Sequence, residues 1–165
     1  MSEACRIVPK FELQTVIDAP PERVFNLARS IDLHTASMAT HHESAVAGVT
    51  TGLIGPGESV TWRARHFFVT FRATVRITAF DAPRHFRDEM VSGPFTRFAH
   101  DHHFKPSGHG TLMRDVFEYE SPLGIVGALA DALILRRHMV RLLRERNDVV
   151  KRVAESADWQ RYLQA

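Results

Sequence analysis

The stretch FRDEMVSGPFTRFAHDHHFKPSGHGTLMRDVFEY, residues 86–119, decides the fold class of this 165-residue chain. It consists of runs in which apolar and polar residues alternate, and the segments SGP and KPSGHG separate these runs. Alternation with a period of two is typical of strands that bury one face, and connections this short favour antiparallel neighbours. The stretch therefore predicts consecutive strands of an antiparallel sheet.

The same alternation extends the sheet towards the N-terminus. Strands are predicted at about residues 6–17, 43–50, 58–66, 67–81, 84–91, 96–105 and 110–120, with GLIGPG and DAPR among the connections. In the longest of them Phe71, Ala73 and Val75 fall on one face, whereas Arg72 and Thr74 fall on the other. Such a strand belongs to a sheet with one buried face and one face in water.

Helices are predicted at both ends of the strand region. The break at residues 18–21 precedes a short helix with Pro21 in its first turn, and a second helical turn is expected over residues 32–40. Beyond Gly124 the period becomes helical, and the apolar stripe of this long helix comprises Val126, Leu129, Leu133, Val140, Leu143, Val150 and Ala154. Its basic residues are expected to form a solvated face: Arg136, Arg137, Arg141, Arg144, Arg146, Lys151 and Arg152.

The long helix is the one predicted element large enough to cover the dry face of the sheet. We therefore expect a single α+β domain over residues 1–165, in which a curved antiparallel sheet of about seven strands wraps around the C-terminal helix. One or two short helices follow the first strand. A sheet that curves around a helix leaves a cavity between the two.

Composition excludes several classes of protein. Cys5 is the only cysteine and the longest apolar run is GIVGALA, residues 124–130, so neither a disulfide framework nor stable membrane insertion is expected. The N-terminus lacks the apolar core of a signal peptide, which predicts a cytoplasmic protein. A formal net charge of +2 gives little reason to expect a nucleic-acid partner. Nucleotide-binding glycine motifs and an activated nucleophile are not found, so no cofactor is expected.

The segment FAHDHHF, residues 98–104, places ionisable side chains on the apolar face of its strand. Phe98, His100, His102 and Phe104 share one face by strand parity, and the two phenylalanines mark that face as inward. The flanking strands repeat the pattern. Asp88 alternates with Phe86 and Met90, and Asp115 alternates with Met113, Phe117 and Tyr119.

The pairing of these strands follows from the assumed loops. If Lys105 pairs with Gly110, His100 faces Asp115 and His102 faces Met113. If Asp88 also pairs with His100, the side chains of Asp88, His100 and Asp115 lie in one row across three neighbouring strands, with the imidazole between the two carboxylates. A slip of two residues would preserve the faces and change the partners.

Four interpretations of this polar group remain open. It is a hydrogen-bonded network that fixes the sheet register, a spot that recognises a ligand, an acid–base catalyst, or a metal site. The catalytic candidates are His100 as acid or base and Asp88 or Asp115 as the carboxylate that fixes its tautomer. A His-x-His pair is a weak zinc signal, so no metal is expected, with His100 and His102 as the ligands should one bind.

The candidate ligand-binding residues are the inward-facing aromatic, methionine and ionisable side chains. They are Trp62, Phe71, Phe86, Asp88, Met90, Phe98, His100, His102, Met113, Asp115, Phe117 and Tyr119. The other histidines, His34, His41, His42, His66, His85, His103, His109 and His138, are expected at the surface. The glycine-rich segment at residues 48–57 is either an ordinary loop or part of the cavity mouth, over which residues 33–42 would form a lid.

This order of elements resembles the helix-grip fold of the START and birch-pollen-allergen (SRPBCC) superfamily, which includes polyketide cyclase/dehydrase-like proteins. The runs FRDEMVSGPF, HDHHF and GTLMRD are similar to a bacterial branch of it, and the similarity covers nearly the whole chain. The resemblance implies an internal cavity that binds a small, largely hydrophobic molecule. The alternative that it implies is a cyclase, dehydratase or isomerase using the Asp and His residues, so whether the protein is an enzyme remains open, as do its ligand and oligomeric state.

Overall fold

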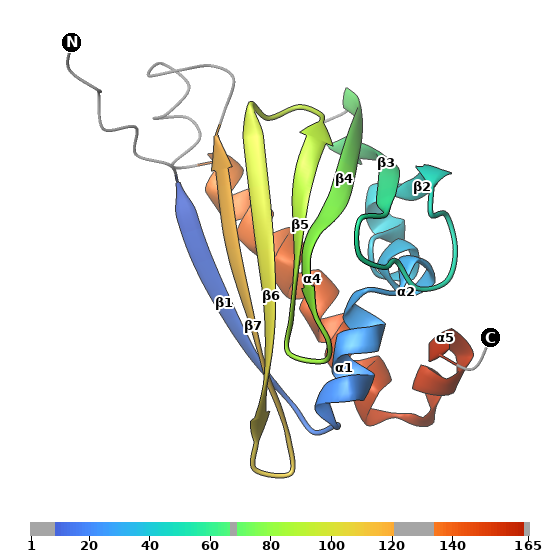
Figure 1. The fold of residues 1–165 in the computed structure, drawn as a ribbon. Helices are drawn as coiled ribbons and strands as arrows, with labels where there is room; N and C mark the ends of the chain where they lie inside the picture. The colour runs from blue at the N-terminus through green and yellow to red at the C-terminus, as the bar shows by residue number, and fades with distance from the viewer. Residues whose placement is uncertain (1–8, 67–68, 121–133, 164–165) are drawn as a thin grey trace.

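The computed structural model describes residues 9–66, 69–120 and 134–163 (Figure 1). The strands are β1 (Lys10–Ile17), β2 (Ser44–Gly48), β3 (Ser59–His66), β4 (Val69–Asp81), β5 (His85–Ser92), β6 (Arg97–Ser107) and β7 (Gly110–Glu120). The helices are α1 (Pro21–Ala28), α2 (Ile31–Ser37), α4 (Arg136–Glu155) and α5 (Gln160–Leu163), with 3-10 turns at Ala39–His41 and Ala157–Trp159. The predicted element order is confirmed over these residues.

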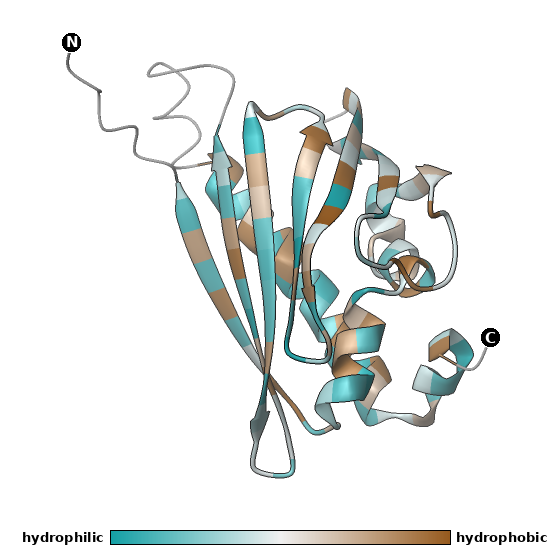
Figure 2. Ribbon diagram, viewed as in Figure 1, coloured by the Kyte–Doolittle hydropathy of each residue, from teal (hydrophilic) through white to brown (hydrophobic). Residues whose placement is uncertain are grey.

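All seven strands form one antiparallel sheet in the order β1-β7-β6-β5-β4-β3-β2. From β2 to β7 each strand pairs with its neighbour in sequence, as the short connections predicted, and β1 closes the order by pairing with β7. The alternation of hydrophilic and hydrophobic residues along the strands is visible in Figure 2. The sheet therefore has one inner, apolar face and one outer, polar face.

The register of β5 against β6 is as predicted, with Asp88 opposite His100. The predicted register of β6 against β7 is wrong by two residues, because His102 and not His100 lies opposite Asp115. The reason is a tighter turn than expected: Ser107 pairs with Gly110, and Gly108 adopts a positive φ of 59° between them. A slip of two preserves the faces, so the inward set of side chains is unchanged.

Helix α4 crosses the inner side of the sheet, behind the strands in Figure 1, and its contacts include β1, α1 and α2. Leu143, Val150 and Ala154 of the predicted stripe are buried. Three other members of that stripe, Val126, Leu129 and Leu133, lie outside the described residues. The described part of the long helix therefore packs on the apolar face of the sheet.

Helix α1 begins at Pro21, whose fixed φ suits the first position of a helix. It carries Phe25 into the core, where the ring meets those of Phe80, Phe86 and Phe104 edge-on at centroid distances of 5.4, 5.6 and 5.4 Å. Edge-to-face contacts of this kind are favourable for aromatic rings. Helix α1 is thereby fixed against the inner face at one end of the sheet.

Candidate functional site

A cavity of about 420 Å³ lies between the inner face of the sheet, helix α4 and helix α2. Its walls are mostly apolar and aromatic side chains. One part of the wall is formed by a cluster of ionisable side chains, called the polar group below, which includes Asp88, His100 and His102. The predicted ligand-binding residues that line it are Trp62, Phe71, Phe86, Asp88, Phe98, His100, His102 and Phe117. Ligand pockets in proteins commonly measure about 300–1,000 Å³ and have this mixture of apolar walls and a few polar groups.

Four candidate residues do not line the cavity. Met113 and Tyr119 are fully buried in apolar clusters, and Asp115, also fully buried, lies behind the two imidazoles. All three belong to β7, where Asn147 of α4 contacts Asp115 and Leu143 of α4 lies in the same apolar cluster as Tyr119. The sulfur of Met90 lies against the backbone turn at Gly93.

The polar group is built around Asp115. Its Oδ1 accepts a hydrogen bond from His100 Nε2 at 2.9 Å and also lies 2.9 Å from His102 Nδ1, with which it makes a close charged contact but no hydrogen bond. Despite the register difference, His100 reaches Asp115 because an imidazole spans the diagonal to the next residue pair of the same face. The two rings lie 3.7 Å apart and are tilted by 38°.

Asp88 closes the group on the cavity side. Its Oδ1 lies 3.9 Å from His100 Nδ1, and its Oδ2 lies 3.6 Å from His102 Nε2. The Asp88 side chain keeps 21% of its surface accessible, whereas those of His100 and His102 keep 7% and 1%. Asp88 is therefore the member of the group best placed to meet a molecule in the cavity.

Helix α4 supplies two polar residues that the sequence interpretation missed. Asn147 Nδ2 donates to Asp115 Oδ2 at 2.7 Å. Arg146, which was expected on the solvated face, is instead 7% exposed, lines the cavity and donates from Nη2 to the carbonyl of Ala28 at 2.7 Å. Asn147 was detectable, because it falls four residues after Leu143 in the apolar stripe, where a polar residue needs a buried partner.

Burial and mutual contacts shift the ionisation of all four groups. Burial opposes the charged form of Asp115, but the adjacent imidazoles of His100 and His102 outweigh burial and hold its pKa well below the usual value. Burial likewise acts to raise the pKa of Asp88, and the same two histidines lower it. Burial and the charge of His102 lower the pKa of His100. For His102 burial is outweighed by the two carboxylates, which raise its pKa.

The cavity wall also contains histidines that were expected at the surface. His34 of α2 lines the cavity and stacks on Trp62 at a centroid distance of 4.1 Å, and His138 of α4 also lines it. The expectation of surface placement is therefore wrong for both. Helix α2 folds over the sheet at this point, and residues 33–42 thus contribute to the wall, as does Ile54 of the glycine-rich segment.

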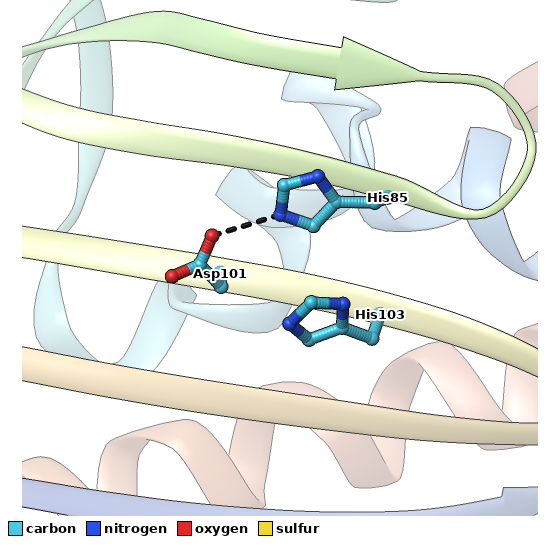
Figure 3. Close-up of side chains that lie close together, drawn as sticks. All are labelled: His85, Asp101 and His103. Atoms are coloured by element: carbon cyan, nitrogen blue, oxygen red, sulfur yellow. Dashed lines mark hydrogen bonds and ion pairs between the residues drawn. The ribbon is translucent and has the colours of Figure 1, made fainter.

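A second His/Asp cluster lies on the outer face of the sheet, as predicted for His85 and His103 (Figure 3). His85 Nε2 lies 2.8 Å from Asp101 Oδ1, and Arg87 Nη1 donates to Asp101 Oδ2 at 3.0 Å. The rings of His85 and His103, which face each other across β5 and β6, stack at 4.6 Å. This outer cluster is partly exposed and has no access to the cavity from its side of the sheet.

No helix in the described part of the chain is long and apolar enough to cross a membrane. No curated protein sequence matches the chain. Solved structures do match it in shape. TTHA0849 from Thermus thermophilus is 23% identical with a TM-score of 0.68, over 86% of this chain and 97% of that one.

Two further matches have lower sequence identity. The KanY protein is 13% identical with a TM-score of 0.70, over 90% of this chain and 99% of its own. Ginseng major latex-like protein 151 from Panax ginseng is 15% identical with a TM-score of 0.66, over 89% and 97%. At these identities the three matches show that the chain has the helix-grip fold.

The model of one protein family, described as polyketide cyclase / dehydrase and lipid transport, matches residues 8–155. The matched range includes every strand, helix α4 and the whole polar group. The family places the chain among proteins that bind hydrophobic molecules or act as polyketide cyclases. The chain therefore belongs to the polyketide cyclase/dehydrase and lipid transport family of the START-like superfamily.

Proposed function

We propose that the protein binds a small, largely hydrophobic molecule in the cavity and that the Asp88 carboxylate receives a hydrogen bond from a polar group of this molecule. The observation that carries the proposal is the buried Asp/His patch in the wall of a largely apolar cavity of about 420 Å³. Apolar walls supply affinity and a few fixed polar groups supply orientation.

The atoms available at the patch define the chemistry of the ligand. Within the described residues Asp88 Oδ1 accepts no hydrogen bond, and Nη1 of Arg146 donates none. A ligand hydroxyl would donate to the part of the Asp88 carboxylate that stays accessible, and a hydrogen bond to a charged group contributes about 1.5–3 kcal/mol. A ligand with a hydroxyl group on an aromatic or alicyclic skeleton suits both the patch and the walls.

A matched pair of substitutions on neighbouring residues of β4 tests binding in the cavity. Ala73 lines the cavity, whereas the side chain of Arg72 is exposed on the other face. We expect wild-type protein and Arg72→Trp to bind the fluorescent dye 1-anilinonaphthalene-8-sulfonate with one site. Ala73→Trp should bind it about tenfold or more weakly, because the indole fills the space. Equal binding by both variants, with cooperative unfolding intact, would place the dye elsewhere and refute the proposal.

One observation favours acid–base catalysis as a second candidate function. His100 and His102 lie beside one carboxylate, yet their pKa values are shifted in opposite directions, which favours the neutral form of His100 and the protonated form of His102. A pair of this kind supplies a base and an acid at one place. The corresponding reactions are proton removal beside a carbonyl group and dehydration.

Proton exchange at a ketone distinguishes catalysis from binding alone. If the group is catalytic, the protein should accelerate the exchange of the α-protons of 2-tetralone with D₂O, followed by NMR. His100→Gln should abolish this acceleration, and His103→Gln, on the outer face of the same strand, should preserve it. If the protein binds 2-tetralone but its α-protons exchange at the uncatalysed rate, the protein binds this class of compound without catalysing the reaction.

A further inference from the structure

We propose that Asp88, His100 and His102 form a binding site for one divalent transition-metal ion of the zinc class, with open coordination positions towards the cavity. Each residue offers one ligand atom, and these atoms all lie within 4.8 Å of one another. Two imidazole nitrogens and a carboxylate oxygen are a common ligand set for Zn²⁺ with an open position. The ion would share the pocket of the proposed function, but its binding requires no organic ligand.

The distances suit an ion at the centre of the three residues. The nitrogens that face Asp88 are His100 Nδ1, 3.9 Å from Oδ1, and His102 Nε2, 3.6 Å from Oδ2. Ligand atoms at about 2.0–2.2 Å from a tetrahedral ion are separated by about 3.4 Å. The two distances to the Asp88 carboxylate exceed this separation by about 0.2 and 0.5 Å, and all three ligand atoms lie within 4.8 Å of one another, so the side chains would have to rotate inward to close the site.

Asp115 lies behind both imidazoles and orients that of His100. Its Oδ1 lies 2.9 Å from His100 Nε2 and 2.9 Å from His102 Nδ1, the nitrogens that do not face Asp88. Asn147 in turn holds Oδ2 at 2.7 Å. A carboxylate behind a ligating histidine fixes the ring and its tautomer and raises the basicity of the metal-binding nitrogen. The hydrogen bond to His100 has this form, and the same carboxylate lies close to His102 without a hydrogen bond.

Unsatisfied atoms lie between the proposed ligands. His102 is 1% exposed, and neither of its ring nitrogens makes a hydrogen bond with the part of the chain that the structure describes. The same holds for Asp88 Oδ1. Buried polar atoms are usually satisfied. An ion bound to His102 Nε2 and Asp88 would satisfy both and balance the charges of the Asp88 and Asp115 carboxylates.

The outer cluster is the natural control. His85, Asp101 and His103 also offer ligand atoms within 4.8 Å of one another. However, both oxygens of Asp101 are already engaged, one with His85 and one with the guanidinium of Arg87. The guanidinium of Arg87 is bonded to the carboxylate and opposes a cation there, whereas Arg146, whose charge also acts on Asp88, is bonded to the carbonyl of Ala28. We therefore expect the outer cluster to contribute little to ion binding.

Metal content and Co²⁺ absorption test the site directly. After removal of metals with EDTA and dialysis against Zn²⁺, elemental analysis should find one zinc per chain in the wild type and in the His85→Gln/His103→Gln double variant. Asp88→Asn and His102→Gln should bind at least about 100-fold more weakly, and Asp115→Asn about 10–100-fold more weakly. The visible absorption of bound Co²⁺ should follow the same order.

Far-UV circular dichroism establishes that each variant is folded. If the His102 variant does not fold, Asp88→Asn carries the test, because Asp88 lies at the cavity surface and its substitution keeps the shape. Absence of stoichiometric zinc in the wild type, or loss of zinc only in the outer double variant, would overturn the proposal. Dye binding by EDTA-treated protein is measured alongside, so that failure of the metal site and failure of the proposed function give different results.

Discussion

Substitution of Asp115 by asparagine should destabilise the protein by about 2–4 kcal/mol at pH 7. The carboxylate accepts a charge-assisted hydrogen bond from His100 and lies beside His102, and it is fully buried. A hydrogen bond to a charged group contributes about 1.5–3 kcal/mol, and removing one member of a buried ion pair costs about 3–5 kcal/mol. The asparagine amide still has one oxygen that accepts a hydrogen bond, and its NH₂ group can bond to Asn147 if that side chain turns over. The expected loss in the free energy of unfolding is therefore below the upper limit of about 5 kcal/mol.

Urea denaturation of metal-free protein measures this loss. Asp101→Asn on the outer face is the matched control, since Asp101 also contacts a histidine and an arginine but in partly exposed positions, and it should cost about 1 kcal/mol or less. The folded-state pKa of Asp115 is lowered, so its contribution is present above the usual aspartate range and is lost as the pH falls through the folded-state pKa. Equal midpoints for the two variants at pH 7 would refute the reasoning.

Three further predictions concern the same elements. In EDTA, the lowered pKa of His100 makes the free energy of unfolding rise with pH up to about 6.5. The raised pKa of His102 makes it fall with pH above about 6.5. In urea titrations, His100→Gln should lose the rise and His102→Gln should lose the fall. Arg146→Met removes a buried bond to a backbone carbonyl and should lower the free energy of unfolding by about 1–3 kcal/mol, whereas the exposed Arg144→Met should change it by about 0.5 kcal/mol or less in the same assay. Gly110→Ala would place a Cβ 2.2 Å from the carbonyl oxygen of Ile17 in β1, and thermal unfolding should show a loss of several degrees; an unchanged midpoint would contradict the close approach of Gly110 to the end of β1.

The inward face of each strand was predictable from sequence, because side-chain direction has a strict period of two. That period brought Asp88, His100, His102 and Asp115 to one face, where the structure places them. Parity does not fix which residues stand opposite one another. The tight turn at Gly108 shifted the partners by two, and only the length of the imidazole kept His100 in contact with Asp115.

The depth of the cavity was less predictable, because it depends on the path of α4 over the sheet. Met113 and Tyr119 have the same parity as Phe117, yet they are enclosed in apolar clusters and Phe117 borders the cavity. Arg146 was assigned to water because charged residues on a helix are usually solvated. Its burial follows from the carbonyl of Ala28 at the end of α1, a tertiary partner that no local pattern reveals.

The central claim is that the Asp88 carboxylate receives a hydrogen bond from the cavity ligand. The most direct test is a cycle of four affinities: 2-naphthol and 2-methylnaphthalene, each titrated into EDTA-treated wild type and Asp88→Ala. Because the two compounds differ in one hydrogen-bonding group of similar size, the ratio of their affinities isolates that bond. If Asp88 accepts this bond, the wild type should favour 2-naphthol over 2-methylnaphthalene by about tenfold more than the variant does. The same ratio in both proteins would contradict it.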